Sequence, residues 1–200
     1  MRAVLYGSAA MLLGLGFGLT PLRTAAAAPM VFTTVLGPEA PGATGSGNGT
    51  VVVDPVANTL SVSFDFSGLS GVTTVAHIHC CTASPGTGTV GVAVTPGTLT
   101  GFLPGFMAGT YSNSFDTEAA ATYAAGFLTG SGGGTPAGAE AALIAGMLAG
   151  TAYINIHSST FGGGEIRGFL TAVPEPASLG LFAVGLAGFA ALRRRRTPAA

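Results

Sequence analysis

The sequence contains no lysine, and its central part has almost no positive charge. Between residues 29 and 172 the only basic side chain is Arg167, against seven acidic side chains, which gives this part a net charge of −6. Binding to nucleic acid needs a basic surface that neutralises phosphates. The composition therefore excludes nucleic acid as a partner of this part of the chain.

Motifs of catalytic sites are also missing. There is no Gly-x-Ser-x-Gly sequence, which hydrolases use to expose a nucleophilic serine. The glycines at 162–164 lack the lysine and helix that follow a phosphate-binding loop, so we interpret them as a hairpin turn. Glu165 and Arg167 share one face of a predicted strand, and a structural ion pair or backbone contact is favoured there over a catalytic acid. We expect no enzyme activity.

The first 28 residues have the three parts of a secretory signal peptide. Arg2 precedes an apolar run over residues 3–19, and small residues follow at 25–28. Cleavage by signal peptidase after Ala27 or Ala28 satisfies the small-residue rule. The alternative is an uncleaved anchor, for which the apolar run is short. We therefore predict that the chain is exported.

The segment 173–200 combines prolines, an apolar run and a basic end. Pro174, Glu175 and Pro176 precede an apolar run over residues 177–192, which is just long enough to cross a bilayer as a helix. Positive charges hold such an end on the cytoplasmic side. An ordinary membrane anchor is one interpretation of this tail. Four arginines close it, namely Arg193, Arg194, Arg195 and Arg196.

The order of these three parts resembles the PEP-CTERM sorting signal. In that family, exosortase recognises and cuts the signal, and the family occurs in Gram-negative bacteria that make exopolysaccharide. The resemblance implies an inner-membrane anchor before processing and a location at the cell surface or outside the cell afterwards. It implies exosortase as a processing partner, and exopolysaccharide or envelope proteins as candidate partners of the mature protein.

The two cysteines, Cys80 and Cys81, are adjacent. Export would place them in an oxidising compartment. The chain has no third cysteine, so a bridge to a distant strand is excluded. A vicinal disulfide, a bond to another molecule and metal ligation remain open.

Alternating apolar and polar side chains predict short strands in the segment 29–172. Residues 37–49 have the glycine- and proline-rich composition of a loop. The last two strands should form a hairpin around the glycines at 162–164, with Asn155 and His157 on a polar face. The predicted strands are 50–54, 60–66, 72–79, 90–94, 98–102, 152–157 and 165–170. The predicted core residues are Phe64, Phe66, Ile154, Ile156, Ile166 and Leu170.

Two helices are predicted between the strands. One would start at Asp116 or Thr117 and continue through Phe127, and an alanine-rich one would span 136–149. Short strands separated by turns indicate a mainly β fold, an antiparallel β-sandwich with a short helical insertion. A signal helix and a transmembrane helix would flank this single domain.

The chain has three histidines, and two of them form a His-x-His pair on a predicted strand. Side chains two residues apart on a strand point to the same face, so His77 and His79 could bind one metal ion together. His157 would have to complete the set from a neighbouring strand. Three imidazoles with an open fourth position, for water or Cys81, suit zinc or copper. The alternative is that all three are polar residues on a partly exposed face, held by backbone hydrogen bonds.

The segments around these histidines contain several further motif residues. They are Ala76-His77-Ile78-His79 with Pro85, Gly86 and Gly88, then Ala152 to Ser158 with Phe161, and Gly163 to Gly168. Together these motifs resemble a CHRD (chordin-type) domain, although Cys80, Cys81 and Gly162 depart from the family pattern. In animals its namesake belongs to an extracellular antagonist of growth factors. The resemblance implies an extracellular interaction domain with a structural, adhesive or binding role at the envelope or in an exopolysaccharide matrix. A small secreted metalloprotein is the alternative.

Overall fold

The computed structural model describes residues 28–174 and 184–189. The signal peptide up to residue 27, Glu175, Pro176 and the arginines at 193–196 lie outside the described residues. Within the described ranges, no helix has the length and apolar character needed to cross a membrane.

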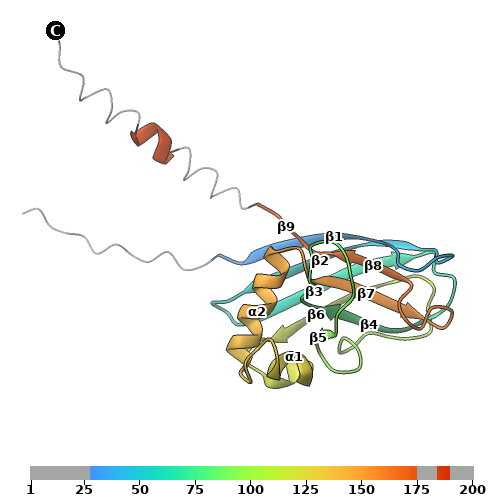
Figure 1. Ribbon diagram of the computed structural model, residues 1–200. Helices are drawn as coiled ribbons and strands as arrows, with labels where there is room; N and C mark the ends of the chain where they lie inside the picture. The colour runs from blue at the N-terminus through green and yellow to red at the C-terminus, as the bar shows by residue number, and fades with distance from the viewer. Residues whose placement is uncertain (1–27, 175–183, 190–200) are drawn as a thin grey trace, which may run out of the picture.

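The described chain is built on nine antiparallel strands (Figure 1). They are hydrogen-bonded in the order β5-β4-β7-β8-β1-β2-β3-β6, and β9 also pairs with β1. The mainly β, antiparallel prediction is confirmed. The strands are β1 (Met30–Pro38), β2 (Ser46–Asp54), β3 (Thr59–Ser67), β4 (Thr73–His79), β5 (Val92–Val94), β6 (Gly109–Asp116), β7 (Tyr153–Ser158), β8 (Ile166–Phe169) and β9 (Thr171–Ala172).

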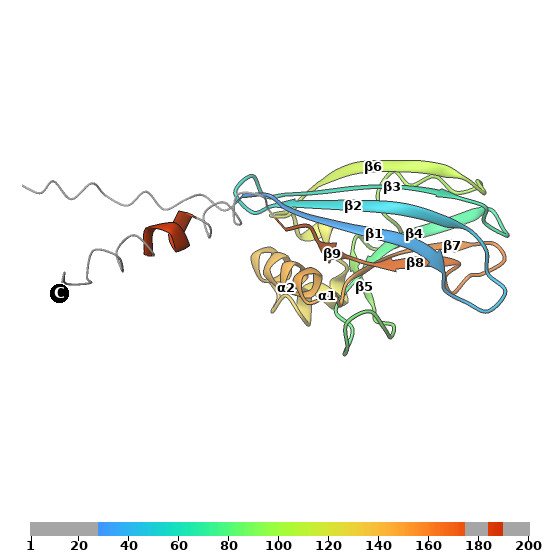
Figure 2. The ribbon, with the colours of Figure 1, turned by 90° about the horizontal axis from the view of Figure 1, so that it is seen from above.

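The sheet curls at β1 so that its two halves lie in two layers (Figure 2). Strand β1 pairs with β2 from Met30 to Leu36 and then with β8 at Gly37 and Pro38. The apolar faces of both layers are thereby buried against each other. All six predicted core residues are buried, including Ile154, which is 0% exposed. In the part of the chain that the structure describes, residues 30–172 contain all the strands and this core.

Two helices lie beside the sandwich, α1 (Ala125–Thr129) and α2 (Pro136–Leu148). The second agrees with its prediction. The Thr135 hydroxyl caps it by accepting a hydrogen bond from the Gly138 N–H at 3.1 Å, and Pro136 stands in its first turn. Leu143 and Met147 bury its inner face.

The expected loop over residues 37–49 is shorter in the structure, where only residues 39–45 connect two strands. β1, which was not predicted, ends at Pro38, and β2 already begins at Ser46. Two of its glycines, Gly47 and Gly49, lie in β2 and serve close packing there. At Gly47 an added Cβ would collide with the Asp65 carbonyl, and at Gly49 it would come within 3.0 Å of the Ile154 and Thr34 side chains. Glycine therefore allows neighbouring chains to approach closely here, and its presence was misread as a turn signal.

The region from 98 to 127 also differs from its prediction. Residues 98–102 form no strand, and β6 occupies 109–116, where none was expected. The predicted helix from 116 or 117 through 127 is replaced by a short 3₁₀ helix, η1 (Ala120–Thr122), followed by α1. The Thr122 hydroxyl donates to the Asp116 carbonyl at 2.5 Å, and the buried Tyr123 hydroxyl donates to the Thr117 carbonyl at 3.1 Å. These contacts fold the chain back and interrupt a continuous helix.

Candidate metal site

The three histidines lie on the outer face of the β4–β7 pair. His77 is directly opposite Asn155, and His79 is opposite Tyr153. Ala76 and Ile78 of β4 and Ile154 and Ile156 of β7 point the other way and are fully buried in the core. His157 lies two residues beyond Asn155 and is a diagonal neighbour of His77. One ring nitrogen from each histidine lies within 4.8 Å of the other two.

This outer face is covered by loops. The segment between β4 and β5 and the turn after β5 place the carbonyls of Val90 and Gly97 against the imidazoles. His77 is only 8% exposed and Asn155 only 2%. The predicted polar face therefore exists, but it is buried. Strand alternation shows which residues share a face, and it does not show that a distant loop covers that face.

A backbone carbonyl fixes which ring nitrogen of each neutral imidazole carries the hydrogen. His77 Nε2 lies 2.9 Å from the Gly97 oxygen, His79 Nδ1 lies 2.8 Å from that of Val90, and His157 Nδ1 lies 2.8 Å from that of Gly162. A carbonyl oxygen only accepts hydrogen bonds, so each of these nitrogens is the donor. In a neutral ring the other nitrogen then carries a lone pair. The free lone pairs are on His77 Nδ1, His79 Nε2 and His157 Nε2.

The nitrogens that carry these lone pairs lie close together, and in the neutral rings none of them has a hydrogen to donate to another. His77 Nδ1 and His157 Nε2 are 3.2 Å apart, and in the neutral rings both are acceptors. His79 Nε2 is buried and has no hydrogen-bond partner in the described chain. Two acceptors at that distance repel each other unless a proton or a cation lies between them. The cluster therefore favours a bound positive charge.

Burial of the imidazoles determines whether a proton or a metal ion is the favoured positive charge. It lowers the pKa of His77, and hydrogen bonding to Gly97 opposes this only in part. Burial also lowers the pKa of His79 below its ordinary value. Desolvation thus disfavours protonated imidazoles and keeps both rings in the neutral form that binds metal ions.

Aromatic and charged side chains surround the imidazoles on the same outer face. The ring of Tyr153 stacks on His79 with centroids 4.7 Å apart, and its hydroxyl accepts the Val90 N–H at 3.3 Å. Arg167 lies 5.4 Å above the Tyr153 ring and forms an ion pair with Glu39 at 3.2 Å. Glu39 also accepts a hydrogen bond from the Asn155 amide. Such outer contacts orient metal ligands.

Asn155 was expected on one strand face with His157, but no supporting role was predicted for it. Tyr153 could have been found in the same way, because it lies two residues before Asn155 and shares that face. Glu39 could not, because it reaches the site from the end of β1. Glu165 is fully buried and accepts the backbone N–H of Ser70, so its contact is to the backbone.

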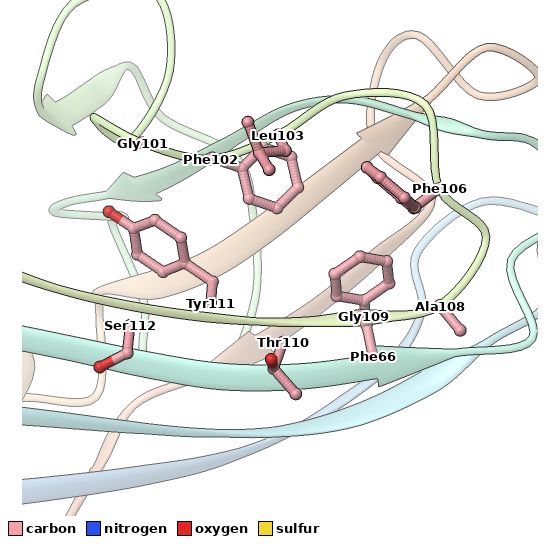
Figure 3. A pocket seen from close by; sticks show the side chains of 10 residues that line it. All are labelled: Phe66, Gly101, Phe102, Leu103, Phe106, Ala108, Gly109, Thr110, Tyr111 and Ser112. Carbon is pink, nitrogen blue, oxygen red and sulfur yellow. The ribbon is translucent and has the colours of Figure 1, made fainter.

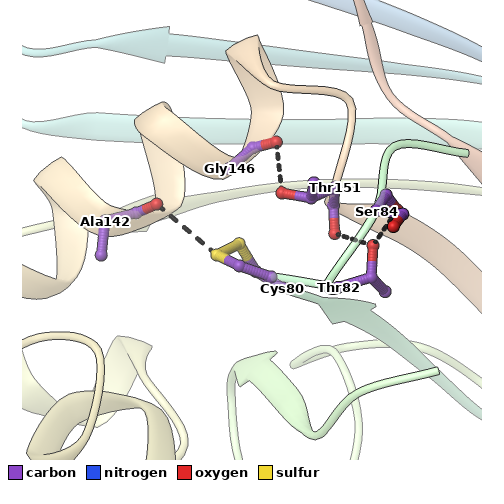
Figure 4. Close-up of a disulfide and its surroundings, with 7 residues drawn as sticks. Cys80, Thr82, Ser84, Ala142, Gly146 and Thr151 are labelled. Carbon is purple, nitrogen blue, oxygen red and sulfur yellow. Dashed lines mark hydrogen bonds between the residues drawn. A yellow bond between two sulfur atoms is a disulfide. The ribbon is translucent and has the colours of Figure 1, made fainter. Parts of the chain in front are cut away.

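The cysteines form a vicinal disulfide that packs against α2 (Figure 4). Cys81 Sγ lies 3.7 Å from the Ala142 carbonyl, and a Cβ added at Gly146 would collide with both sulfurs. A disulfide sulfur is not a thiolate, the form of cysteine that binds metal ions. Cys81 is therefore not available as a fourth ligand in this structure.

An aromatic pocket lies between β6 and the segment that precedes it (Figure 3). No charged side chain and none of the three histidines lines it. It is separate from the histidine cluster. Its aromatic lining residues are Phe66, Phe102, Phe106 and Tyr111.

Comparison with known proteins gives two matches. The family model described as CHRD domain matches residues 32–170, and the model of the PEP-CTERM protein-sorting motif matches residues 172–196. No curated protein and no solved structure matches the chain.

Proposed function

The chain belongs to the CHRD domain family, and we propose that its role outside the cell is to bind a transition-metal ion, zinc or copper, through His77, His79 and His157. The PEP-CTERM motif makes it an exported protein that exosortase sorts. The proposal places the mature domain at the cell envelope or in the exopolysaccharide matrix. It assigns a binding role to the domain and no reaction.

The convergence of three imidazole lone pairs supports this proposal most strongly. The 3.2 Å approach of His77 Nδ1 to His157 Nε2 needs a positive charge, and burial works against supplying it as a proton. A metal ion would satisfy both nitrogens and also the unpartnered His79 Nε2. Three neutral imidazoles with one open position suit zinc and copper.

Removing residues 173–200 should convert the protein from a membrane-attached to a soluble exported form. The deletion takes away the apolar run and the arginines that would hold the chain in the inner membrane. Fractionation of a host without exosortase measures this. In a host that has exosortase, mass spectrometry of the mature full-length protein shows whether the tail is cut. A mature protein that still contains Arg193–Arg196 would show that the tail is a permanent anchor.

Zinc affinity should fall as the pH is lowered. The fall should begin at a lower pH than it does for free imidazole. Protons compete with the metal ion for the ring nitrogens, and an ordinary histidine titrates near about 6.5. Burial lowers the pKa values of His77 and His79, so these two rings stay neutral to a lower pH. Competition titration of residues 29–172 with a chromophoric chelator between pH 5 and 8 tests this. Affinity that does not change over this range would contradict histidine ligation.

A further inference from the structure

Two buried acceptor atoms without a partner lie on the outer face of β4 and β7. One is His79 Nε2 and the other is Asn155 Oδ1. Asn155 is opposite His77 and two residues before His157, so its side chain shares their face. A buried carbonyl oxygen without a donor is unfavourable. The amide oxygen of Asn155 therefore indicates a donor that belongs to this site.

The orientation of the Asn155 amide follows from its other end. Its Nδ2 donates to the Glu39 carboxylate, which Arg167 holds in an ion pair at 3.2 Å. A carboxylate only accepts hydrogen bonds, so this contact fixes which amide atom is nitrogen. Glu39 follows the end of β1 that pairs with β8. The two polar atoms of an amide diverge, so Oδ1 is directed away from Glu39, and it lies on the face that Asn155 shares with His77.

We propose that Asn155 is a positioning residue of the metal site and that its Oδ1 accepts a hydrogen bond from a water molecule bound to the metal ion. This inference rests on the proposed function. A metal ion satisfies His79 Nε2 directly, and a water in its fourth position satisfies Asn155 Oδ1. A metal ion with one bound water would thus provide a partner for both unpaired acceptors, His79 Nε2 and Asn155 Oδ1.

The neighbouring charge strengthens this arrangement. The negative Glu39 attracts the Asn155 N–H and polarises the amide, which makes Oδ1 a better acceptor for the water. Direct ligation by Oδ1 is the less favoured geometry, because amide oxygens suit hard cations such as calcium, whereas three imidazoles suit zinc and copper. The oxygen therefore contacts the water, which contacts the metal ion.

Wild-type residues 29–172 loaded with Cu²⁺ test the bound water directly. Electron paramagnetic resonance in ¹⁷O-enriched water should show broadened lines, because the oxygen of a bound water couples to the copper electron. This measurement needs no mutant. Copper bound by the wild type without any ¹⁷O broadening would overturn the inference and leave the proposed function standing.

Asn155→Ala tests the contribution of the amide. Copper should still bind, with an affinity about 10–100-fold lower, as is typical for loss of an outer contact, and with a changed resonance spectrum. Thr34→Val is the matched control, since it removes another unpartnered buried oxygen from β1, on a strand that holds none of the histidines. Equal affinity and an identical spectrum in Asn155→Ala and wild type would contradict the inference. Failure of the wild type to bind copper at all would instead overturn the proposed function.

Discussion

Replacing Phe64 with alanine should lower the free energy of unfolding of residues 29–172 by about 3–5 kcal/mol. Phe64 lies on β3 and is only 4% exposed. Its ring stacks on Tyr111 with centroids 5.0 Å apart and lies 5.9 Å from the ring of Phe102. Alanine would leave a cavity at the centre of this aromatic group, because the surrounding strands cannot close over it.

Urea denaturation at equilibrium measures the effect, with Ser63→Ala as the control. Ser63 is the neighbour of Phe64 on the same strand and points outward into solvent. Its replacement should change stability by less than about 0.5 kcal/mol. A loss below about 1 kcal/mol for Phe64→Ala would mean that the faces of β3 are reversed.

Replacing any one of the three histidines with alanine should weaken zinc binding by more than about 100-fold. Loss of an outer contact already lowers metal affinity by about 10–100-fold, and loss of a ligand removes a bond to the ion itself. His79→Ala should have this effect although His79 is the last residue of β4. Its Nε2 has no other partner in the described chain. Zinc titration of the three single variants measures it.

Stability separates ligand loss from misfolding in these variants. Each should remain folded without zinc, and none should be stabilised by added zinc as the wild type is, because an ion that binds only the folded state raises its stability. Ser63→Ala, on the exposed face of β3, is the control, and added zinc should stabilise it as it does the wild type. Equal zinc affinity in the wild type and all three histidine variants would make the histidines structural.

The sequence predicted the strands whose polar and apolar residues alternate. β3, β4, β7 and β8 were found because one side of each faces the core, as for Phe64 and Phe66 on β3. β6 was missed because only Tyr111 and Phe115 bury apolar side chains among its serine, threonine and asparagine residues. The glycines of β2 were misread because sequence alone does not separate a flexible turn from a close packing contact.

The candidate site was also predictable in part, because residues two apart on a strand share a face. The two-residue spacing of His77 and His79 places them on one face of any strand. Their meeting with His157 depends on the β4–β7 register, which places Asn155 opposite His77. The carbonyls of Val90 and Gly97 come from loops that are far from β7 in sequence. No local pattern encodes those contacts.

Anomalous diffraction from crystals of residues 29–172 grown with zinc tests the metal site most directly. The account predicts one strong zinc peak at about 2.0–2.1 Å from His77 Nδ1, His79 Nε2 and His157 Nε2. Data collected on both sides of the zinc absorption edge identify the element. Zinc-saturated crystals with no peak between these three nitrogens would contradict the account.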